Sequence, residues 1–209
     1  MRRIFVFTLI PLLFALALPM SARAGGKLEG KVIGLDAGHG GHDVGAVNAS
    51  PANTLNESDM DISVVNLLQQ KLEADGARVA LTRTGNNFVG LHERVAAANA
   101  AGAHILLSVH HNSAGPDVNG TESYYTQADD HPLANAMQAR LTRTFGLRDR
   151  GVKYVPDFVL TNRPNMPSII TEGSFVTNDS EAGSWLRSNR AEQEATALHD
   201  GIIDYFAQH

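Results

Sequence analysis

Residues 31–45 read KVIGLDAGHGGHDVG, and this stretch decides the fold. The segment 31–36 is a short, mostly apolar run of the kind that forms a buried strand. The segment 37–45 follows directly and is so rich in glycine that neither a strand nor a helix can continue through it. The stretch therefore predicts a buried strand that ends in a loop able to turn sharply.

Helical and strand patterns alternate along the rest of the chain. A helix is predicted to begin at Ser58, where Ser58-x-x-Asp61 resembles a capping box, and to end at Asp75-Gly76. The other predicted helices are 91–101, 132–145 and 189–207, and the other predicted strands are 77–82, 104–109, 120–126 and 167–171. The segment 148–163 gives no clear pattern. Helices of this length between strands predict an α/β single domain with a twisted, mainly parallel sheet and helices on both faces.

The N-terminus has the features of an export signal. A positive start at residues 1–3 precedes an apolar run at 4–18, and Ala22-Arg23-Ala24 fits a cleavage site. An uncleaved membrane anchor is the alternative, but an apolar run of about 15 residues broken by Pro11 is short for a span of roughly 20. We therefore expect a signal peptide at 1–24, a mature domain at 25–209, and export to the periplasm or the exterior of a bacterium.

The composition excludes several functions. The formal net charge of -5 predicts no strongly basic face for nucleic acid or an anionic membrane surface. The chain has no cysteine, which excludes disulfides, thiolate catalysis and thiolate metal sites, and leaves 9 histidines as the candidate soft ligands. A metal site in this chain must therefore use histidine and carboxylate side chains.

Three residues that can carry chemistry follow the ends of predicted strands: His39, His110 and Glu172. Ligands of parallel sheets bind beyond the carboxyl ends of the strands, so these side chains are expected at one edge. His39 lies among glycines that let the backbone aim its ring into a cleft. A phosphate-binding loop is the poorer interpretation, because neither a Gly-Lys-Ser/Thr ending nor a G-x-G-x-x-G motif leading into a helix is present.

The sequence leaves two questions open: which of His110 and His111 is functional, and whether Glu57 belongs to the site. Adjacent side chains of a strand point to opposite faces, so His110 and His111 cannot easily serve one site. We expect His110 to be the functional residue, because it continues the strand directly and has Asn112 on the same side as an orienting partner. His111 is expected to touch substrate or to face solvent. Glu57, just before the predicted helix, can reach back toward the glycine-rich loop, although a glutamate at a helix start is usually solvated.

The residue types match a catalytic metal site. Two histidines and a carboxylate with one open position are a ligand set of catalytic zinc, so His39, Glu57 and His110 are the predicted zinc ligands. A carboxylate at the end of a buried strand is costly to bury without a task. Glu172 is therefore the predicted group that deprotonates the attacking water and then protonates the departing amine.

These residues resemble the motifs of the zinc-dependent N-acetylmuramoyl-L-alanine amidases of the family 3 type, which are cell-wall hydrolases. The resemblance runs from about residue 32 almost to the C-terminus. Ala37 stands where the family loop has proline, and one extra residue precedes Phe175 in the last motif. The matching segments are 36–41, Glu57, Thr82-Arg83, 91–99 with Arg94, 108–110 and 172–178.

The resemblance implies one Zn²⁺ ion held by His39, Glu57 and His110, with Glu172 as the catalytic acid and base. It implies hydrolysis of the amide bond between the lactyl group of N-acetylmuramic acid and L-alanine of the peptidoglycan stem peptide. Peptidoglycan or muramyl peptides are then the partners, a protein activator stays open, and a monomer is expected. A zinc peptidase and a noncatalytic wall-binding module are the alternatives, although the H-E-x-x-H helix of many zinc peptidases is absent.

Three other side chains receive structural interpretations. Arg83 and Arg94 are expected to be ion-pair partners within the fold rather than substrate contacts. Trp185, near the last predicted helix, is expected to be a packing residue.

Overall fold

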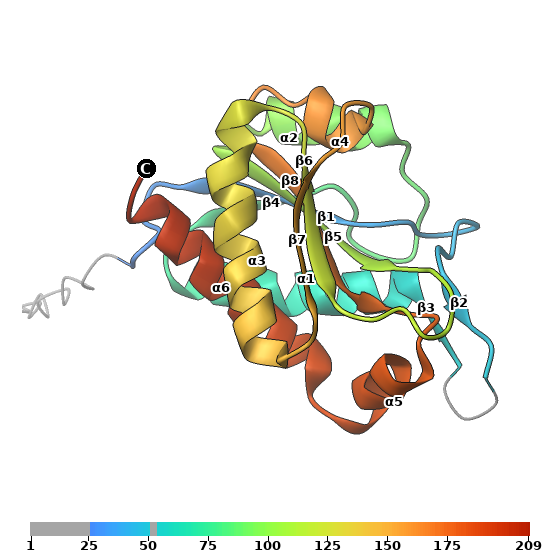
Figure 1. The fold of residues 1–209 in the computed structure, drawn as a ribbon. Helices are drawn as coiled ribbons and strands as arrows, with labels where there is room; N and C mark the ends of the chain where they lie inside the picture. The colour runs from blue at the N-terminus through green and yellow to red at the C-terminus, as the bar shows by residue number, and fades with distance from the viewer. Residues whose placement is uncertain (1–25, 51–53) are drawn as a thin grey trace, which may run out of the picture.

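The computed structural model describes residues 26–50 and 54–209, so the predicted signal peptide at 1–24 lies outside the described residues. Its centre is a six-stranded sheet in the order β4-β1-β5-β8-β6-β7, and Figure 1 shows helices on both sides of it. The strands are β1 (Val32–Ala37), β4 (Arg78–Leu81), β5 (Ile105–Asn112), β6 (Thr121–Tyr125), β7 (Asp149–Tyr154) and β8 (Ser168–Phe175). A separate hairpin joins β2 (Val47–Asn48) to β3 (Leu55–Asn56).

Four of these strands run parallel to one another. β1 pairs in parallel with both β4 and β5, and β5 pairs in parallel with β8. β6 is antiparallel to β8, and β7 is parallel to β6, so these last two strands run in the opposite direction. The predicted α/β domain with a mainly parallel sheet is therefore confirmed. The carboxyl ends of β1, β5 and β8 lie side by side at one edge.

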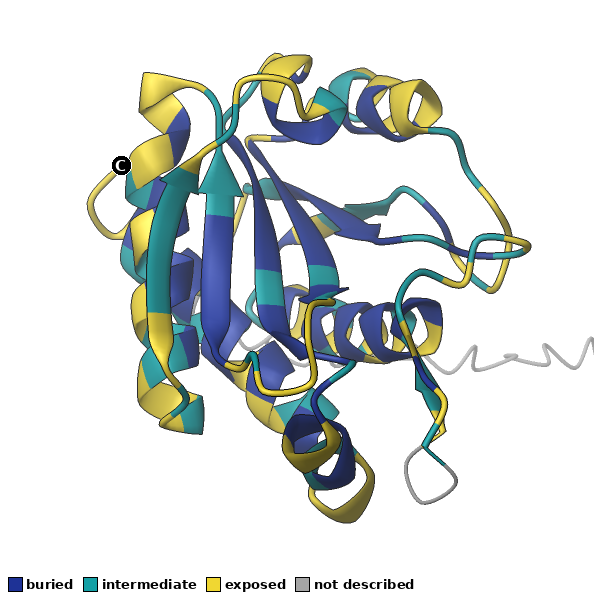
Figure 2. Ribbon diagram, turned by 45° about the vertical axis from the view of Figure 1, so that its right-hand side comes forward, coloured by how far each residue is buried: buried dark blue, intermediate teal, exposed yellow. Residues whose placement is uncertain are grey.

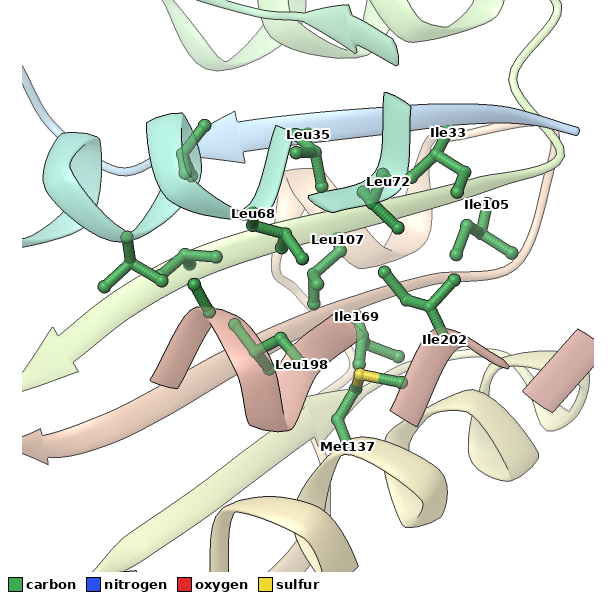
Figure 3. Close-up of a cluster of buried hydrophobic side chains, with 14 of the residues drawn as sticks. Ile33, Leu35, Leu68, Leu72, Ile105, Leu107, Met137, Ile169, Leu198 and Ile202 are labelled. Carbon is green, nitrogen blue, oxygen red and sulfur yellow. The ribbon is translucent and has the colours of Figure 1, made fainter. Parts of the chain in front are cut away.

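The main core lies between the sheet and three long helices. These helices are α1 (Glu57–Ala74), α3 (His131–Phe145) and α6 (Arg190–Phe206). Side chains that alternate along β1 and β5, such as Leu35 and Leu107, meet Leu68 and Leu198 of the helices with no exposed surface (Figure 3). This packing follows from the period of two along the strands and the apolar stripe of each helix.

The opposite face of the sheet carries smaller helices. These are α2 (Leu91–Ala100) and the single turn α4 (Val159–Asn162), which cover two small apolar clusters around Leu106 and Ile170. The helix α5 (Asp179–Arg187) and the short 3-10 turn η1 (Ala128–Asp130) complete the described elements. In Figure 2 the strands are buried through most of their length and exposed residues line the outer sides of the helices. None of the described helices is long and apolar enough to cross a membrane.

The structure differs from the sequence prediction at several places, and β5 and β8 extend past their predicted ends, so that His110 and Glu172 lie within these strands. The segment 148–163 contains β7 and α4, and α5 was not predicted, because these elements are a polar edge strand and two short helices. The start of α1 was also predicted wrongly. Asn56, and not Ser58, caps this helix: its side-chain oxygen accepts the backbone N–H of Asp59 at 2.9 Å. Ser58 and Asp61 are both buried.

Two buried arginines hold the glycine-rich loop after β1. Arg94 from α2 forms an ion pair with Asp36, 2.9 Å from Nη1 to Oδ1, and also donates to the carbonyl of His39 at 2.6 Å. Arg83 donates to the carbonyls of Ala37 at 2.9 Å and Gly38 at 2.8 Å. Arg94 therefore forms an ion pair within the fold, as predicted. Arg83 was also predicted to form one, but its hydrogen bonds go to backbone carbonyls. The two guanidinium groups thus fix the loop through its carbonyls at residues 37–39.

The ion pair between Arg94 and Asp36 makes a prediction about stability. Replacing Arg94 with methionine leaves the Asp36 carboxylate buried without its cation, so the variant should lose about 3–5 kcal/mol of unfolding free energy. The matched control is Arg140→Met, which breaks partly exposed pairs with Asp200 and Asp204 and should cost at most about 1 kcal/mol. Denaturant unfolding of both variants measures the difference. Equal losses would contradict the assigned role of Arg94.

Candidate metal centre

His39 reaches the site from the strained loop after β1. Its φ of 57° is the one positive value among non-glycine residues in the described part of the chain. Gly40 and Gly41, with φ of 120° and 63°, continue the turn that aims the imidazole inward. The ring Nδ1 lies 2.9 Å from Oδ2 of Asp43, while Nε2 lies 3.0 Å from Oε1 of Glu57. Asp43 therefore orients the ring so that Nε2 faces the centre of the site.

Glu57 enters from the first residue of α1 and is 5% exposed. Its Oε2 accepts the backbone N–H of Ala46 at 2.8 Å, and its Oε1 accepts that of His111 at 3.2 Å. The same Oε1 lies 3.0 Å from Nε2 of His39 and 2.9 Å from Nδ1 of His110. One carboxylate oxygen thus joins two imidazole nitrogens that come from separate strand ends.

The two adjacent histidines of β5 lie in different environments, as the alternation of a strand predicts. His110 lines the cleft beside α4, together with Phe158 and Ile170. His111 points to the other side, where it contacts Asp61 of α1 and Glu194 of α6 and has no exposed surface. The expectation that His111 touches substrate or faces solvent is therefore wrong. Its ring is covered by helices that pack on the main core.

Asp61 is the member of the site that the sequence reasoning missed. One ligand atom from each of His39, Glu57, Asp61 and His110 can be chosen so that all four lie within 4.8 Å of one another. Asp61 follows Glu57 by four residues on α1, so both carboxylates occupy the same face of the helix. This spacing was the available signal, but Asp61 was interpreted as part of a cap.

Glu172 lies beside this cluster on the next strand. Its Cα is the partner of His110 in the β5–β8 ladder, and its side chain lines the same cleft. Its Oε2 is buried and accepts no hydrogen bond from the described residues. Burial raises the pKa of Glu172 to about 8, with His110 opposing the rise and Glu57 and Asp61 adding to it. A carboxyl group in this state can both take and give a proton near neutral pH.

The cluster favours positive charge at its centre. Burial alone would favour the neutral form of Glu57, but hydrogen bonds with His110 and His39 outweigh it and hold the pKa of Glu57 well below its usual range. Burial likewise opposes a charged His110, yet the contact with Glu57 and the nearby Asp61 raise the pKa of His110 to about 10. The residues therefore stabilise positive charge between them. A divalent metal ion bound there would supply that charge in place of protons.

A cleft with a volume of about 400 Å³ opens over these residues. His39, Glu57, His110 and Glu172 line it, and an apolar pocket of about 220 Å³ continues from it past Leu91 and Phe158. Two histidine nitrogens, carboxylate oxygens and access from solvent are what a catalytic divalent metal site requires. Asp61 belongs to the same cluster, and its Oδ2, which is buried and has no hydrogen-bond partner among the described residues, also fits a bound cation. The roles of these residues as metal ligands stay predictions.

The arrangement is that of an α/β protein with a cluster of candidate metal ligands near the carboxyl ends of parallel strands. The sequence model of the N-acetylmuramoyl-L-alanine amidase family matches residues 33–204. The chain therefore belongs to this amidase family, as its motifs predicted.

Relatives and solved structures agree with this assignment. The chain is 37% identical over 198 residues to the uncharacterized protein YqiI of Bacillus subtilis, covering 93% of this chain and 94% of that protein. It is 34% identical to the N-acetylmuramoyl-L-alanine amidase LytC of Bacillus subtilis, covering 90% of this chain but only 38% of LytC.

Among solved structures, the catalytic domain of the amidase CwlV from Bacillus (Paenibacillus) polymyxa var. colistinus matches with a TM-score of 0.79 and 31% identity. That match covers 86% of this chain and 99% of the domain. The CwlD amidase from Clostridioides difficile, solved in complex with the GerS lipoprotein, has a TM-score of 0.76 and 26% identity, covering 86% of this chain and 100% of CwlD.

Gly38 supplies a test of the packing around the site. A Cβ at this position would lie 2.3 Å from Cε1 of His110 and 2.6 Å from Oδ2 of Asp61. Gly38→Ala should therefore displace both side chains and lower the free energy of unfolding by about 1–3 kcal/mol. Gly115→Ala is the control, because its Cβ would meet no atom within 4 Å, and its effect should stay within about 1 kcal/mol. Thermal unfolding measures both, and an unchanged Gly38→Ala variant would contradict the described packing.

Proposed function

We propose that this protein is a zinc-dependent N-acetylmuramoyl-L-alanine amidase. It would hydrolyse the amide bond between the lactyl group of N-acetylmuramic acid and L-alanine of the stem peptide. The observation that carries the proposal is the convergence of His39 Nε2 and His110 Nδ1 on Oε1 of Glu57, at 3.0 and 2.9 Å. Membership of the amidase family supports the choice of substrate.

His39, Glu57 and His110 are the side chains that would hold the zinc ion, at the rim of a cleft open to solvent. Bound there, zinc would act as a Lewis acid that activates water and polarises the scissile carbonyl. Asp43 contributes by fixing the ring of His39 through its Nδ1, and the backbone N–H groups of Ala46 and His111 fix the Glu57 carboxylate. The protein thus supplies an oriented set of ligands before substrate arrives.

Glu172 is the proposed acid and base of the reaction. As a carboxylate it would accept a proton from the attacking water, and as a carboxylic acid it would return that proton to the nitrogen of the departing L-alanine. Its position opposite His110 on the neighbouring strand puts the group beside the metal ligands. Its Oε2 is buried and has no hydrogen-bond partner among the described residues, while the residue as a whole lines the cleft that would receive substrate.

The cleft offers different surroundings on its two sides. Leu91, Phe158 and Ile170 form an apolar wall, and Phe158 is 43% exposed. Asn112 and Ser113 lie on the polar side of the cleft, and Asn112 donates to Glu122 at 2.8 Å. We assign the apolar wall to the methyl groups that flank the scissile amide and the polar side to hydrogen bonding with the rest of the muramyl peptide.

Export and partners belong to the same proposal. A cell-wall substrate requires the protein outside the cytoplasm, which agrees with the expected signal peptide at 1–24. The complex of CwlD with the GerS lipoprotein is a precedent for partner proteins in this family, and we retain a protein activator as an option for this chain. A monomer is the proposed catalytic form, since the candidate ligands and Glu172 all come from one chain.

The reaction is tested by incubating the purified protein with intact peptidoglycan and identifying the released ends by mass spectrometry. The expected products are free stem peptides that begin with L-alanine. Removing metal with a chelator should stop their release, and adding Zn²⁺ should restore it. Cleavage inside the stem peptide would indicate a peptidase instead, and no release at all would favour a noncatalytic wall-binding module.

Replacing Glu172 tests its proposed role in proton transfer in the same assay. Glu172→Gln keeps the size of the side chain but removes proton transfer, so the turnover rate should fall by roughly 10²–10⁴. The zinc content of the variant should equal that of the native protein. The control is Glu192→Gln on α6, which changes a partly exposed salt bridge with Lys71 and should leave the turnover rate unchanged. Normal turnover by Glu172→Gln would refute the proton-transfer role.

A further inference from the structure

The carboxylate of Asp61 is buried in an unusual state. The residue has no exposed surface, and its Oδ1 lies 2.7 Å from Nδ1 of His111. Its Oδ2 is also buried but makes no hydrogen bond within the described part of the chain. An unpartnered carboxylate oxygen inside a protein costs free energy that folding alone does not recover. This oxygen therefore needs a partner that none of the described side chains supplies.

The unpartnered oxygen faces the metal centre. A Cβ on Gly38 would lie 2.6 Å from Oδ2 of Asp61 and also 2.6 Å from Nδ1 of His110, so both atoms border the same small space. The glycine leaves that space free. Asp61 is also one of the four residues whose ligand atoms can all lie within 4.8 Å of one another. The oxygen is thus directed at the nitrogens and oxygens that gather around Glu57.

The other oxygen of the Asp61 carboxylate, Oδ1, is fixed by His111. His111 lies between Asp61 and Glu194, with its Nε2 3.1 Å from Oε2 of Glu194. The indole of Trp185 meets the same imidazole edge to face, with ring centroids 4.8 Å apart. Both ring nitrogens of His111 thus face carboxylates and the ring packs against Trp185, and these contacts hold the ring in place. Asp61 is consequently fixed in the orientation that directs Oδ2 toward His110.

A purely structural network does not account for this arrangement. Buried ionic groups usually contribute no more stability than apolar residues of the same volume, and partly satisfied networks contribute less. Both Asp61 and Glu194 keep one buried oxygen without a hydrogen bond among the described residues. Of these two residues, only Asp61 belongs to the set of candidate metal ligands in the described part of the chain. A bound cation at that point would balance the charge that the fold leaves exposed to the site.

We propose that Asp61 is a fourth side chain of the metal centre, which holds the divalent ion through Oδ2, and that His111 and Glu194 are its positioning residues. The inference rests on the proposed function, because it concerns the same ion as His39, Glu57 and His110. Zinc can expand from four to five ligands, so a fourth protein side chain leaves a position for water or substrate. The ion would therefore bind more tightly than three side chains alone allow.

The test is the zinc affinity of the apo protein, measured by competition with a chromogenic chelator. Asp61→Asn keeps the shape of the side chain and removes its charge, and the dissociation constant for Zn²⁺ should rise by roughly 10–100-fold. The control is Asp59→Asn on the exposed side of the same helix turn, which should leave the dissociation constant unchanged. His111→Asn, which removes the support behind Asp61, should also weaken zinc binding.

A second measurement separates metal binding from folding. For each variant, the zinc-induced rise in Tm is compared with the Tm of the same variant in chelator, so that a less stable apo form does not alter the comparison. The rise should be smaller for Asp61→Asn than for the native protein and for Asp59→Asn. Equal zinc affinity and equal rises in Asp61→Asn and native protein would overturn the role of Asp61 and leave the proposed amidase intact. A native protein that binds no zinc would overturn both.

Discussion

The contact of one Glu57 oxygen with an imidazole nitrogen of His39 and another of His110 is the interaction on which the site depends. It joins the loop after β1, the first turn of α1 and the end of β5, which are far apart in the sequence. Each partner is fixed independently. Asp43 orients His39, backbone N–H groups hold Glu57, and the sheet register sets His110 opposite Glu172. A displacement of any one element would separate these candidate ligand atoms.

The glycine-rich loop is the part of this arrangement that needs most support. The loop has three successive positive φ values at His39, Gly40 and Gly41, and its regular backbone pairing is limited to one isolated bridge between Gly40 and Asp43. Arg83 and Arg94 provide the missing hydrogen bonds, since their guanidinium groups donate to carbonyls of residues 37–39. The favourable burial of apolar side chains in the main core offsets the cost of these buried charges. The stable sheet and its helices thus maintain a strained, polar edge.

Much of the site followed from the sequence because strand geometry is simple. The alternation of side chains separated His110 from His111, and the rule for parallel strands brought His39, His110 and Glu172 to one edge. The buried environment of His111 did not follow, because its partners Asp61 and Glu194 lie on helices 50 and 83 residues away. Asp61 itself was hidden by a plausible capping pattern. The edge strand β7 and the short helices α4 and α5 lack the long apolar periodicity that identifies larger elements.

The account stands on a single divalent ion bound where these elements meet, and anomalous diffraction from zinc-soaked crystals measures this most directly. Data collected on both sides of the zinc absorption edge should give one strong anomalous peak per chain, in contact with His39 Nε2, Glu57 and His110 Nδ1. The account would be contradicted by the absence of a peak at saturating zinc, or by a peak elsewhere while these three side chains point away from one another.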